Sequence, residues 1–234
     1  MQLSTRDVSE ALDVSEATIT RWIRQRGLPA RHVAGQYRFH RAELLEWATA
    51  NGVKVRADLF DRFDDEDEPP PELADALERG GIFYKLPDTN RDSALRAMVG
   101  VLPLPNDIDR DLLLRLFLAR EAAASTGVGG GIALPHVRNP IVLHVPRPVV
   151  SLCFLERPVD FGALDGLPVH TLFAVISPTT RGHLQLLSRI AYALHDDVFK
   201  SAVASQAPAE NILRMARRVD ATLSDRAAAG KADR

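Results

Sequence analysis

The chain of 234 residues has a single cysteine, Cys153, few aromatic residues (6%) and no uninterrupted apolar run of membrane-spanning length. One cysteine cannot form an internal disulfide, which fits a reducing compartment, and it supplies no cysteine-based metal motif. A transmembrane helix needs about 18 or more apolar residues in succession, and the N-terminus also lacks the apolar core of a signal peptide. We therefore expect a cytoplasmic protein without membrane insertion.

The chain also lacks a strong net charge, because its charges are partitioned along the sequence. With 29 basic and 31 acidic residues the formal charge is -2, which excludes a generic nucleic-acid coat. Residues 17–42 hold six arginines and no carboxylate, whereas residues 61–68 are mostly acidic and three prolines follow them. Such a run predicts a solvated linker. The expected division is a first domain at 1–52, a linker at 53–78, a second domain at 79–223 and a disordered tail at 224–234.

Capping signals predict a succession of short helices in the first domain. Ser4, followed three residues later by Asp7, indicates one helix start, and Ser15 indicates a second. Residues 33–39 read as a small hairpin around Gly35, and a last helix is expected over residues 41–50. Helix, turn, helix, hairpin and helix is a layout typical of DNA-binding domains.

The segment Leu12–Ile23, with Gly35–Arg38 as a wing, resembles the excisionase and MerR-type winged helix-turn-helix, a small and mostly α-helical domain. The resemblance implies that the second helix enters the major groove of double-stranded DNA and that the hairpin contacts the backbone. Arginines on these elements would neutralise DNA phosphates. The candidate DNA-binding residues are Thr18, Thr20, Arg21, Arg24, Arg26 and Arg38.

The most informative stretch of the chain is Ser125–His136, in which four glycines fall within five residues. Such a backbone turns tightly and exposes consecutive N–H groups, which predicts a nest for an anion. A short apolar strand and Pro135 then lead to His136, a nucleophile beside the anion site. No lysine follows the glycines as in a P-loop, and the expected helix–loop–strand order differs from a dinucleotide fingerprint. The pattern therefore favours a phosphoryl group carried on histidine.

The stretch from Arg120 to His136 resembles the active-site signature of enzyme IIA of the bacterial phosphotransferase system, in its mannitol/fructose/nitrogen class. The likeness continues in Pro158–Phe161, Asp165–Val169 and Arg181–Ser188, and it covers roughly residues 80 to 222. It implies that His136 takes phosphate from a small histidine phosphocarrier protein and passes it to a cysteine of a separate enzyme IIB. Two positions depart from the family: Gly130, where asparagine is frequent, and Val137, where glycine is usual.

The resemblance also assigns the residues that would hold the phosphoryl group. Arg120 and His183 correspond to the family's active-site arginine and second histidine. The expected phosphate-binding loop consists of Ser125, Thr126, Gly127, Gly129, Gly130 and Gly131. We expect neither a cofactor nor a metal, although a metal site on His136 and His183 stays open as a distant alternative.

Apolar patterns in the second domain alternate between helices and β-rich strands, which indicates an α/β fold. Helices are expected at residues 91–102, 107–122, 180–195, 197–205 and 208–223, and buried strands at residues 148–155 and 169–177. The resemblance implies a mixed central sheet flanked by helices.

Together these patterns predict a DNA-binding protein with a fused enzyme IIA-like domain that couples phosphorylation to transcription or relays phosphate onward. Two alternatives remain open. In the first, the enzyme IIA-like domain is an unphosphorylated docking or dimerisation module. In the second, the chain is a sugar-uptake enzyme IIA whose winged domain contacts a protein. A homo-oligomer is compatible with each of these hypotheses.

Overall fold

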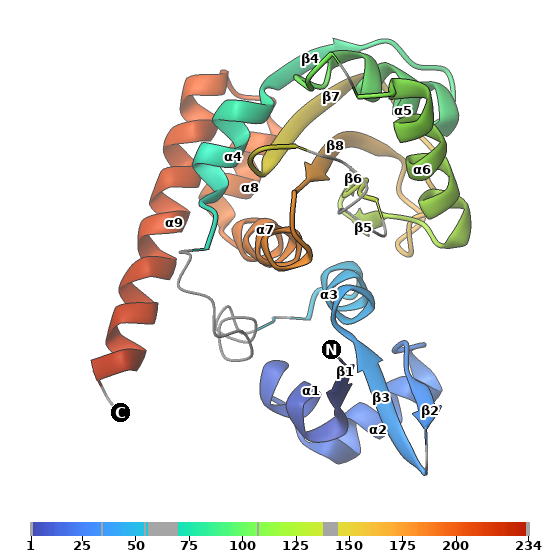
Figure 1. The fold of residues 1–234 in the computed structure, drawn as a ribbon, viewed down its shortest axis with the longest axis vertical. Helices are drawn as coiled ribbons and strands as arrows, with labels where there is room; N and C mark the ends of the chain where they lie inside the picture. Colours follow the sequence, from blue (N-terminus) through green and yellow to red (C-terminus); the bar gives the residue numbers. More distant parts are fainter. Residues whose placement is uncertain are drawn as a thin grey trace. The chain divides into compact units, whose positions relative to one another are not determined.

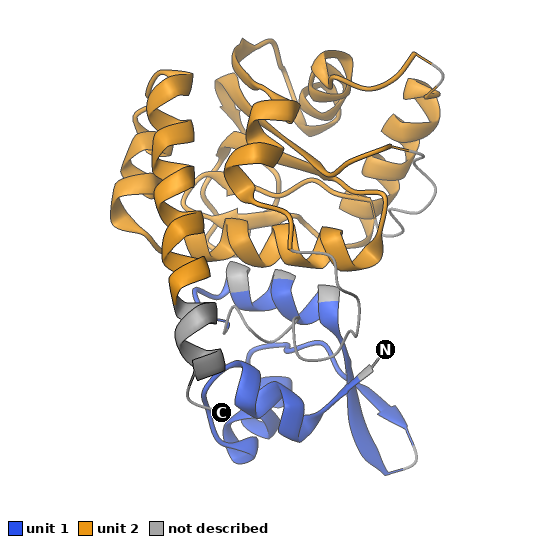
Figure 2. Cartoon of the chain, turned by 60° about the vertical axis from the view of Figure 1, so that its left-hand side comes forward, with its two compact units in different colours: residues 1–66 blue, residues 67–234 orange. Residues whose placement is uncertain are grey.

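The computed structural model in Figure 1 describes residues 2–33, 35–53, 55, 70–106, 108–137 and 145–232. The chain divides into two compact units, Met1–Glu66 (unit 1) and Asp67–Arg234 (unit 2), which Figure 2 distinguishes by colour. The acidic run at residues 61–68, predicted as linker, lies outside the described residues. No helix in the described part of the chain is both long and apolar enough to cross a membrane.

Unit 1 combines three short strands with three helices. Its elements are β1 (Gln2–Ser4), α1 (Thr5–Ala11), α2 (Glu16–Gln25), β2 (Arg31–Val33), β3 (Gln36–His40) and α3 (Arg41–Ala50). Ser4 and Asp7 form the expected capping box, and the Ser15 side chain accepts a hydrogen bond from the Thr18 amide at the start of α2. The two helices of the predicted helix-turn-helix therefore begin where the sequence indicates.

The sequence analysis missed β1, which adds a third strand to the predicted hairpin. The sheet order is β1-β3-β2, and all pairs are antiparallel. Leu3 pairs with Phe39, and both side chains are buried. A three-residue strand that ends on the helix cap Ser4 is too short to show an alternating pattern, so only the pairing with β3 reveals it.

Unit 2 is an α/β unit with a five-stranded sheet. Its elements are α4 (Leu73–Gly80), β4 (Ile82–Leu86), α5 (Arg91–Val101), α6 (Arg110–Ala123), β5 (Gly127–Gly129), β6 (Ile132–Ala133), β7 (Val149–Val159), β8 (Val169–Ile176), α7 (Thr180–Ala193), α8 (Asp197–Ala204) and α9 (Ala209–Ala232).

The sheet of unit 2 is mixed, as the sequence analysis expected. Its strand order is β4-β7-β8-β6-β5, with β4 parallel to β7, β6 parallel to β8, and the remaining pairs antiparallel. Figure 1 shows α5 and α6 on one side of the sheet, and α4, α7, α8 and α9 on the other. Because both faces are covered, residues 149–155 of β7 and 172–176 of β8 are buried and almost all apolar.

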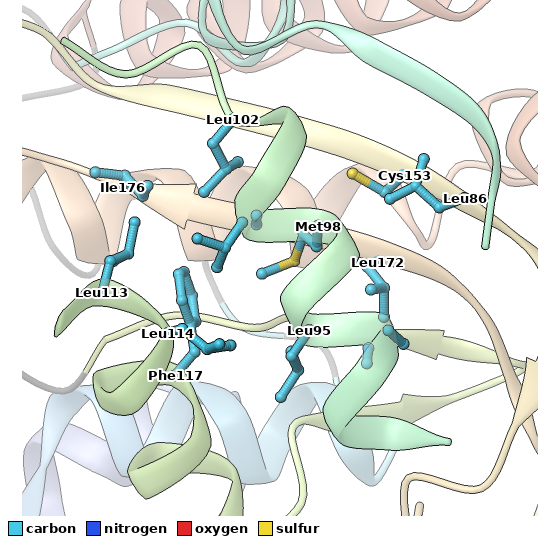
Figure 3. Packing of buried hydrophobic residues seen from close by; sticks show 14 of the residues in the cluster. Leu86, Leu95, Met98, Leu102, Leu113, Leu114, Phe117, Cys153, Leu172 and Ile176 are labelled. Carbon is cyan, nitrogen blue, oxygen red and sulfur yellow. The ribbon is translucent and has the colours of Figure 1, made fainter. Parts of the chain in front are cut away.

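A hydrophobic core of unit 2 lies between the sheet and the pair α5 and α6 (Figure 3). Met98 of α5 and Phe117 of α6 belong to the same buried cluster as Cys153, Leu172 and Ile176 of the two central strands. Alternate residues of β8 contribute to this cluster, which is the period expected of a strand. This packing fixes the end of α6 beside the sheet.

Two boundaries differ from the predicted ones. The end of the predicted linker, residues 73–78, belongs to α4 (Leu73–Gly80), and Leu73 and Leu77 are fully buried. The nearby prolines and acidic residues masked a short apolar pattern. The helix expected to end near Leu223 continues to Ala232, within the predicted disordered tail. The residues after Leu223 are rich in alanine, a strong helix former.

A buried carboxylate of α9 ties the start of α4 to the rest of unit 2. Among the described residues, the N-cap residue Glu72 makes no side-chain capping bond. Asp220 instead accepts hydrogen bonds from the backbone amides of Leu73 (3.1 Å) and Ala74 (2.8 Å). Arg189 of α7 forms an ion pair with the same carboxylate. Three helices therefore meet at one buried charge.

Candidate functional site

A glycine-rich hairpin, β5–β6, leads the chain to His136. Gly129, Gly130 and Gly131 have φ values of 88°, 60° and 75°, in the left-handed region that favours glycine. At Gly131 a Cβ atom would also collide with the imidazole of His170. Beyond β6, His136 forms a parallel bridge with Val175 near the end of β8. The four glycines therefore build a tight hairpin at the edge of the sheet.

The hydrogen bonds of His136 assign its tautomer. Nδ1 lies 2.7 Å from the carbonyl oxygen of Leu134, and Nε2 lies 3.3 Å from Nε of Arg120. A carbonyl oxygen only accepts and a guanidinium only donates, so Nδ1 carries the proton and Nε2 presents its lone pair. The side chain is only 2% exposed. The imidazole is thus held in the form in which Nε2 is nucleophilic.

His183 lies beside His136, at the start of α7. Thr179 caps this helix, and the centroids of the two imidazole rings are 5.2 Å apart. Nδ1 of His183 is buried and has no hydrogen-bond partner among the described residues. Burial lowers the pKa of His183 from 6.5 to about 3, with smaller contributions from His136 and Arg120. His183 is therefore neutral at physiological pH.

The last turn of α6 supplies two further charged groups. Nη1 of Arg120 donates to the Ala124 carbonyl at 2.8 Å, which fixes the guanidinium next to His136. The adjacent Glu121 accepts hydrogen bonds from both the amide and the hydroxyl of Thr126. Glu121 lies within the signature stretch from Arg120 to His136, but the sequence analysis gave it no role. Its position directly after Arg120, five residues before Thr126, was the available signal.

The structure brings Arg120, His136 and His183 together, but it uses several loop groups differently from the predicted anion nest. The amides of Thr126, Gly127 and Gly130 donate to Glu121, Ser125 and Asp165, respectively. The hydroxyl of Ser125 donates to the carbonyl of Phe161. These groups fasten the hairpin to its surroundings. That the loop holds phosphate stays a prediction, and it now depends chiefly on Arg120 and His183.

In unit 1 the predicted DNA-binding residues divide into exposed and structural groups. Arg21 and Arg24 are exposed on α2, on the face opposite the buried Ile19. Thr18 bonds to the Ser15 cap, and the hydroxyl of Thr20 donates to the carbonyl of Glu16. Among these positions, Arg21 and Arg24 are therefore the strongest candidates for DNA contact.

Arg26 and Arg38 are held by neighbouring side chains. The guanidinium carbon of Arg26 lies 5.3 Å and 5.5 Å from the ring centroids of Trp22 and Trp47. The Trp47 indole donates to the Arg26 carbonyl, so this arginine joins α2 to α3. On the wing, Arg38 donates to the side chain of Gln36 at 2.8 Å. Arg26 thus has a structural role that its sequence context did not indicate.

A metal centre finds no support in this geometry. Within the described ranges no group of three or more histidine, cysteine, aspartate or glutamate side chains is placed to bind a metal ion. The histidine pair adjoins a guanidinium, and an arginine does not serve as a metal ligand. The site instead combines a nucleophilic nitrogen with a cation, a combination that suits an anionic group.

A mixed sheet flanked by helices, with a buried histidine pair beside an arginine, defines an enzyme IIA-type unit. The chain belongs to the family of the phosphoenolpyruvate-dependent sugar phosphotransferase system, EIIA 2, which matches residues 76–218. Residues 3–52 match a helix-turn-helix domain family. Both resemblances inferred from the sequence are thereby confirmed, as is the α/β fold class.

The similar proteins include nitrogen regulatory proteins. The nitrogen regulatory protein of Pseudomonas aeruginosa is 35% identical over 126 residues, covering 52% of this chain and 79% of that protein. The one from Bradyrhizobium diazoefficiens is 36% identical over 137 residues, covering 57% and 88%. The crystal structure of nitrogen regulatory protein IIA-Ntr from Neisseria meningitidis aligns with a TM-score of 0.54 at 23% identity, over 62% of this chain and 98% of that one.

Proposed function

We propose that the protein accepts a phosphoryl group on Nε2 of His136 and that the phosphorylation state regulates DNA binding by unit 1. The observation that carries the proposal is the orientation of His136. Its Nδ1–H is held by the Leu134 carbonyl, while Nε2 faces the Arg120 guanidinium. An imidazole attacks phosphorus only through an unprotonated nitrogen, and this arrangement presents one.

In the proposed transfer, the Nε2 lone pair of His136 forms a bond to phosphorus as the bond from phosphorus to the donor nitrogen breaks. The donor is a small histidine phosphocarrier protein, whose imidazole leaves with the electron pair. The proton on Nδ1 of His136 stays in place, bonded to Leu134. No external oxidant or base is needed, because phosphoryl transfer relies mainly on positioning and charge stabilisation.

The surrounding groups would stabilise the added negative charge. Arg120 is held beside Nε2 and can donate to a phosphoryl oxygen, and charge-assisted bonds of this kind are strong. His183 offers its buried Nδ1 at the start of α7, where the helix dipole favours an anion. A phosphoryl group brings about -1.5 to -2 charges, which would favour the protonated form of His183. Onward transfer would go to a separate enzyme IIB.

The proposed DNA-binding surface is the exposed face of α2 together with the wing β2–β3. Arg21 and Arg24 are exposed on this helix, and Arg31 is exposed on the wing. Their charges would neutralise phosphates, the main source of sequence-independent affinity. Phosphorylation of His136 would alter that affinity through the charge it adds to the same chain.

The first experiment labels the purified full chain with phosphoenolpyruvate, enzyme I and the phosphocarrier protein. We expect acid-labile, alkali-stable label on the wild type and on His195→Gln, a matched control with an exposed histidine, but none on His136→Gln. Because Nε2 is the unprotonated nitrogen in this tautomer, alkaline hydrolysis should yield 3-phosphohistidine. An unlabelled wild type would refute the proposal and favour the alternative of a docking or dimerisation module.

The second experiment measures binding of the full chain to random-sequence duplex DNA at increasing salt. The slope of log K against log salt reports the number of phosphates neutralised. Arg21→Gln should weaken binding and reduce the magnitude of this slope by about 1. Arg96→Gln, an exposed arginine of α5, should leave both quantities unchanged. Equal binding by all three proteins would refute α2 as the DNA-binding surface.

A further inference from the structure

Glu121 occupies a position that is unfavourable for an acidic side chain. It lies in the last turn of α6, a 14-residue helix whose C-terminal end carries partial negative charge, and it is only 3% exposed. Two donors of one residue compensate for this. The amide of Thr126 lies 3.1 Å and 3.2 Å from the two carboxylate oxygens, and the Thr126 hydroxyl donates to one of them. Glu121 therefore fixes Thr126 at the point where the β5–β6 hairpin begins.

From Thr126 a chain of hydrogen bonds continues to His136. The carbonyl of Thr126 accepts the amide of Leu134 at 3.0 Å. The carbonyl of Leu134 in turn accepts Nδ1–H of His136 at 2.7 Å. Nε2 of the same imidazole lies 3.3 Å from Nε of Arg120, which directly precedes Glu121 in α6. These contacts form a closed circuit that begins and ends in one helical turn.

Burial and a further backbone contact hold this circuit in place. All five of its residues are buried, and hydrogen bonds away from water are electrostatically stronger. The carbonyl of Pro135 also accepts the amide of Val175 in β8 at 3.1 Å. The segment that ends at His136 is thus fixed to β8 on one side and to Thr126 on the other. A displacement of Thr126 would move the Leu134 carbonyl, which selects the tautomer of His136.

We propose that Glu121 is a positioning residue that keeps His136 in the tautomer with an unprotonated Nε2, an inference that rests on the phosphoryl transfer proposed above. The hydrogen bonds of an imidazole decide which of its nitrogens carries the proton. A carboxylate that orients a histidine often contacts its Nδ1–H directly. Here Thr126 and Leu134 intervene, which separates the negative charge from the imidazole that would receive the phosphoryl group.

Asp165 provides a matched control, because it is a second carboxylate bound to the same hairpin. It accepts the amide of Gly130 at 2.7 Å, but its side chain is exposed. Gly130 lies in the turn beyond the paired residues Gly129 and Ile132, whereas His136 follows the opposite end of β6. Loss of the Asp165 carboxylate should therefore loosen the tip of the hairpin and leave the tautomer of His136 unchanged.

The test is ¹⁵N NMR of the histidine ring nitrogens in the unphosphorylated full chain, with the His136 signals assigned by their absence in His136→Gln. Glu121→Gln replaces one acceptor oxygen by an NH₂ group that cannot accept, and Thr126→Val removes the hydroxyl with little change of shape. Each should raise the ratio of the Nε2–H to the Nδ1–H tautomer of His136 about threefold or more. The wild type and Asp165→Asn should hold the proton on Nδ1.

The double variant Glu121→Gln/Thr126→Val should change the ratio by less than the sum of the two single effects, because both substitutions act on one contact. Circular dichroism establishes that each variant is folded. An unchanged ratio in either folded single variant, or additive effects in the double variant, would overturn the proposal.

The rate of phosphorylation provides a second readout. Glu121→Gln should lower the maximal rate about tenfold, since a misplacement of about 1 Å can cost a hundredfold. The half-saturating concentration of the phosphocarrier protein should stay the same, because Glu121 is buried. Asp111→Asn, an exposed carboxylate of the same helix, should react like the wild type. A change in the half-saturating concentration alone would contradict the positioning role. The NMR comparison needs no phosphoryl transfer, so an unlabelled wild type would refute the proposed function while the tautomer ratio still tests Glu121.

Discussion

The two imidazoles of unit 2 lie 5.2 Å apart and differ in what surrounds their nitrogens. Both nitrogens of His136 have a partner, whereas Nδ1 of His183 is buried without one in the described part of the chain. Two adjacent histidines and a guanidinium would repel one another if both rings were protonated. Keeping His183 neutral therefore makes the pair compatible with Arg120 until an anion arrives.

This charge state predicts how the stability of unit 2 depends on pH. The pKa of His183 is about 3 in the folded protein and 6.5 as a free group, so between these values only the unfolded chain binds the proton. The stabilisation is complete above pH 6.5 and is lost as the pH falls, at up to roughly 1.4 kcal/mol per pH unit. Urea unfolding followed by far-UV circular dichroism from pH 7 to pH 5 measures this slope.

His183→Gln should remove that part of the slope, since glutamine does not titrate. His195→Gln, which changes an exposed histidine, should retain it. Identical slopes in the wild type and His183→Gln would mean that His183 is protonated in the folded protein as readily as in the unfolded chain.

For Arg26 we predict an effect on the free energy of unfolding of unit 1 and not on a direct contact with DNA. Its guanidinium lies over both Trp22 and Trp47, so Arg26→Lys should lower the free energy of unfolding of unit 1 by about 1 kcal/mol. Arg21→Gln, at an exposed position, should change it by less than about 0.5 kcal/mol. Both tryptophans of the chain lie in unit 1, so tryptophan fluorescence in urea isolates this transition.

A loss of DNA affinity in Arg26→Lys without any change in the unfolding midpoint would contradict the structural role. It would indicate instead that the guanidinium contacts DNA directly, as the sequence analysis first suggested.

Among the elements, the β5–β6 hairpin requires glycine at particular positions. Gly131→Ala should destabilise unit 2 strongly for two reasons. The added Cβ would collide with the imidazole of His170. Alanine is also strained at the positive φ of this position, which alone costs about 1–3 kcal/mol. Gly130→Ala has a similar φ, but its Cβ would meet no atom of the described structure within 4 Å. It should therefore cost only the backbone strain, about 1–3 kcal/mol.

Chemical unfolding of the two glycine variants provides the comparison. Equal losses of stability would show that the hairpin moves away from His170 at no cost. The rate of phosphorylation offers a second measurement, since a displaced hairpin also displaces the segment that ends at His136.

The elements that could be predicted from sequence are those with local signals. Ser4 and Ser15 mark their helix starts by chemistry that acts within three residues, and the apolar run Leu172–Ile176 is long enough to identify a buried strand. β1 and α4 depend on distant partners, Phe39 for one and Asp220 for the other. The propensity of a short segment does not reveal contacts with residues far away in the sequence, so the analysis missed these two elements.

The candidate site divides in the same way. The signature motif identified His136, Arg120 and His183, which the fold brings together from three elements. The tautomer of His136 and the buried state of His183 follow from packing, which sequence does not display.

At the scale of the whole molecule, Asp220 contacts residues far from it in the sequence, so its substitution should affect α4 and α7 as well as its own helix. Asp220→Asn removes the charge that pairs with Arg189, while the amides of Leu73 and Ala74 also depend on this side chain. Breaking a buried ion pair on one side costs about 3–5 kcal/mol, and the retained amide oxygen should limit the loss to about 2–4 kcal/mol. Urea unfolding followed by circular dichroism measures it.

Asp225→Asn, an exposed carboxylate on the same helix, is the matched control and should unfold like the wild type. Tryptophan fluorescence should show no change in unit 1 for either variant. A stable Asp220→Asn protein would mean that water or Glu72 replaces the missing cap.

The cap that Asp220 provides also affects how the chain folds while it is being synthesised. Unit 1 builds its sheet and helices from residues 2–50, so its elements leave the ribosome before those of unit 2. α4 begins at Leu73, yet the carboxylate that caps it lies 147 residues downstream, and β4 pairs with β7. During synthesis, unit 1 is therefore complete before α9 has been made. Until then the apolar side chains of α4 stay exposed, where they can bind chaperones or aggregate.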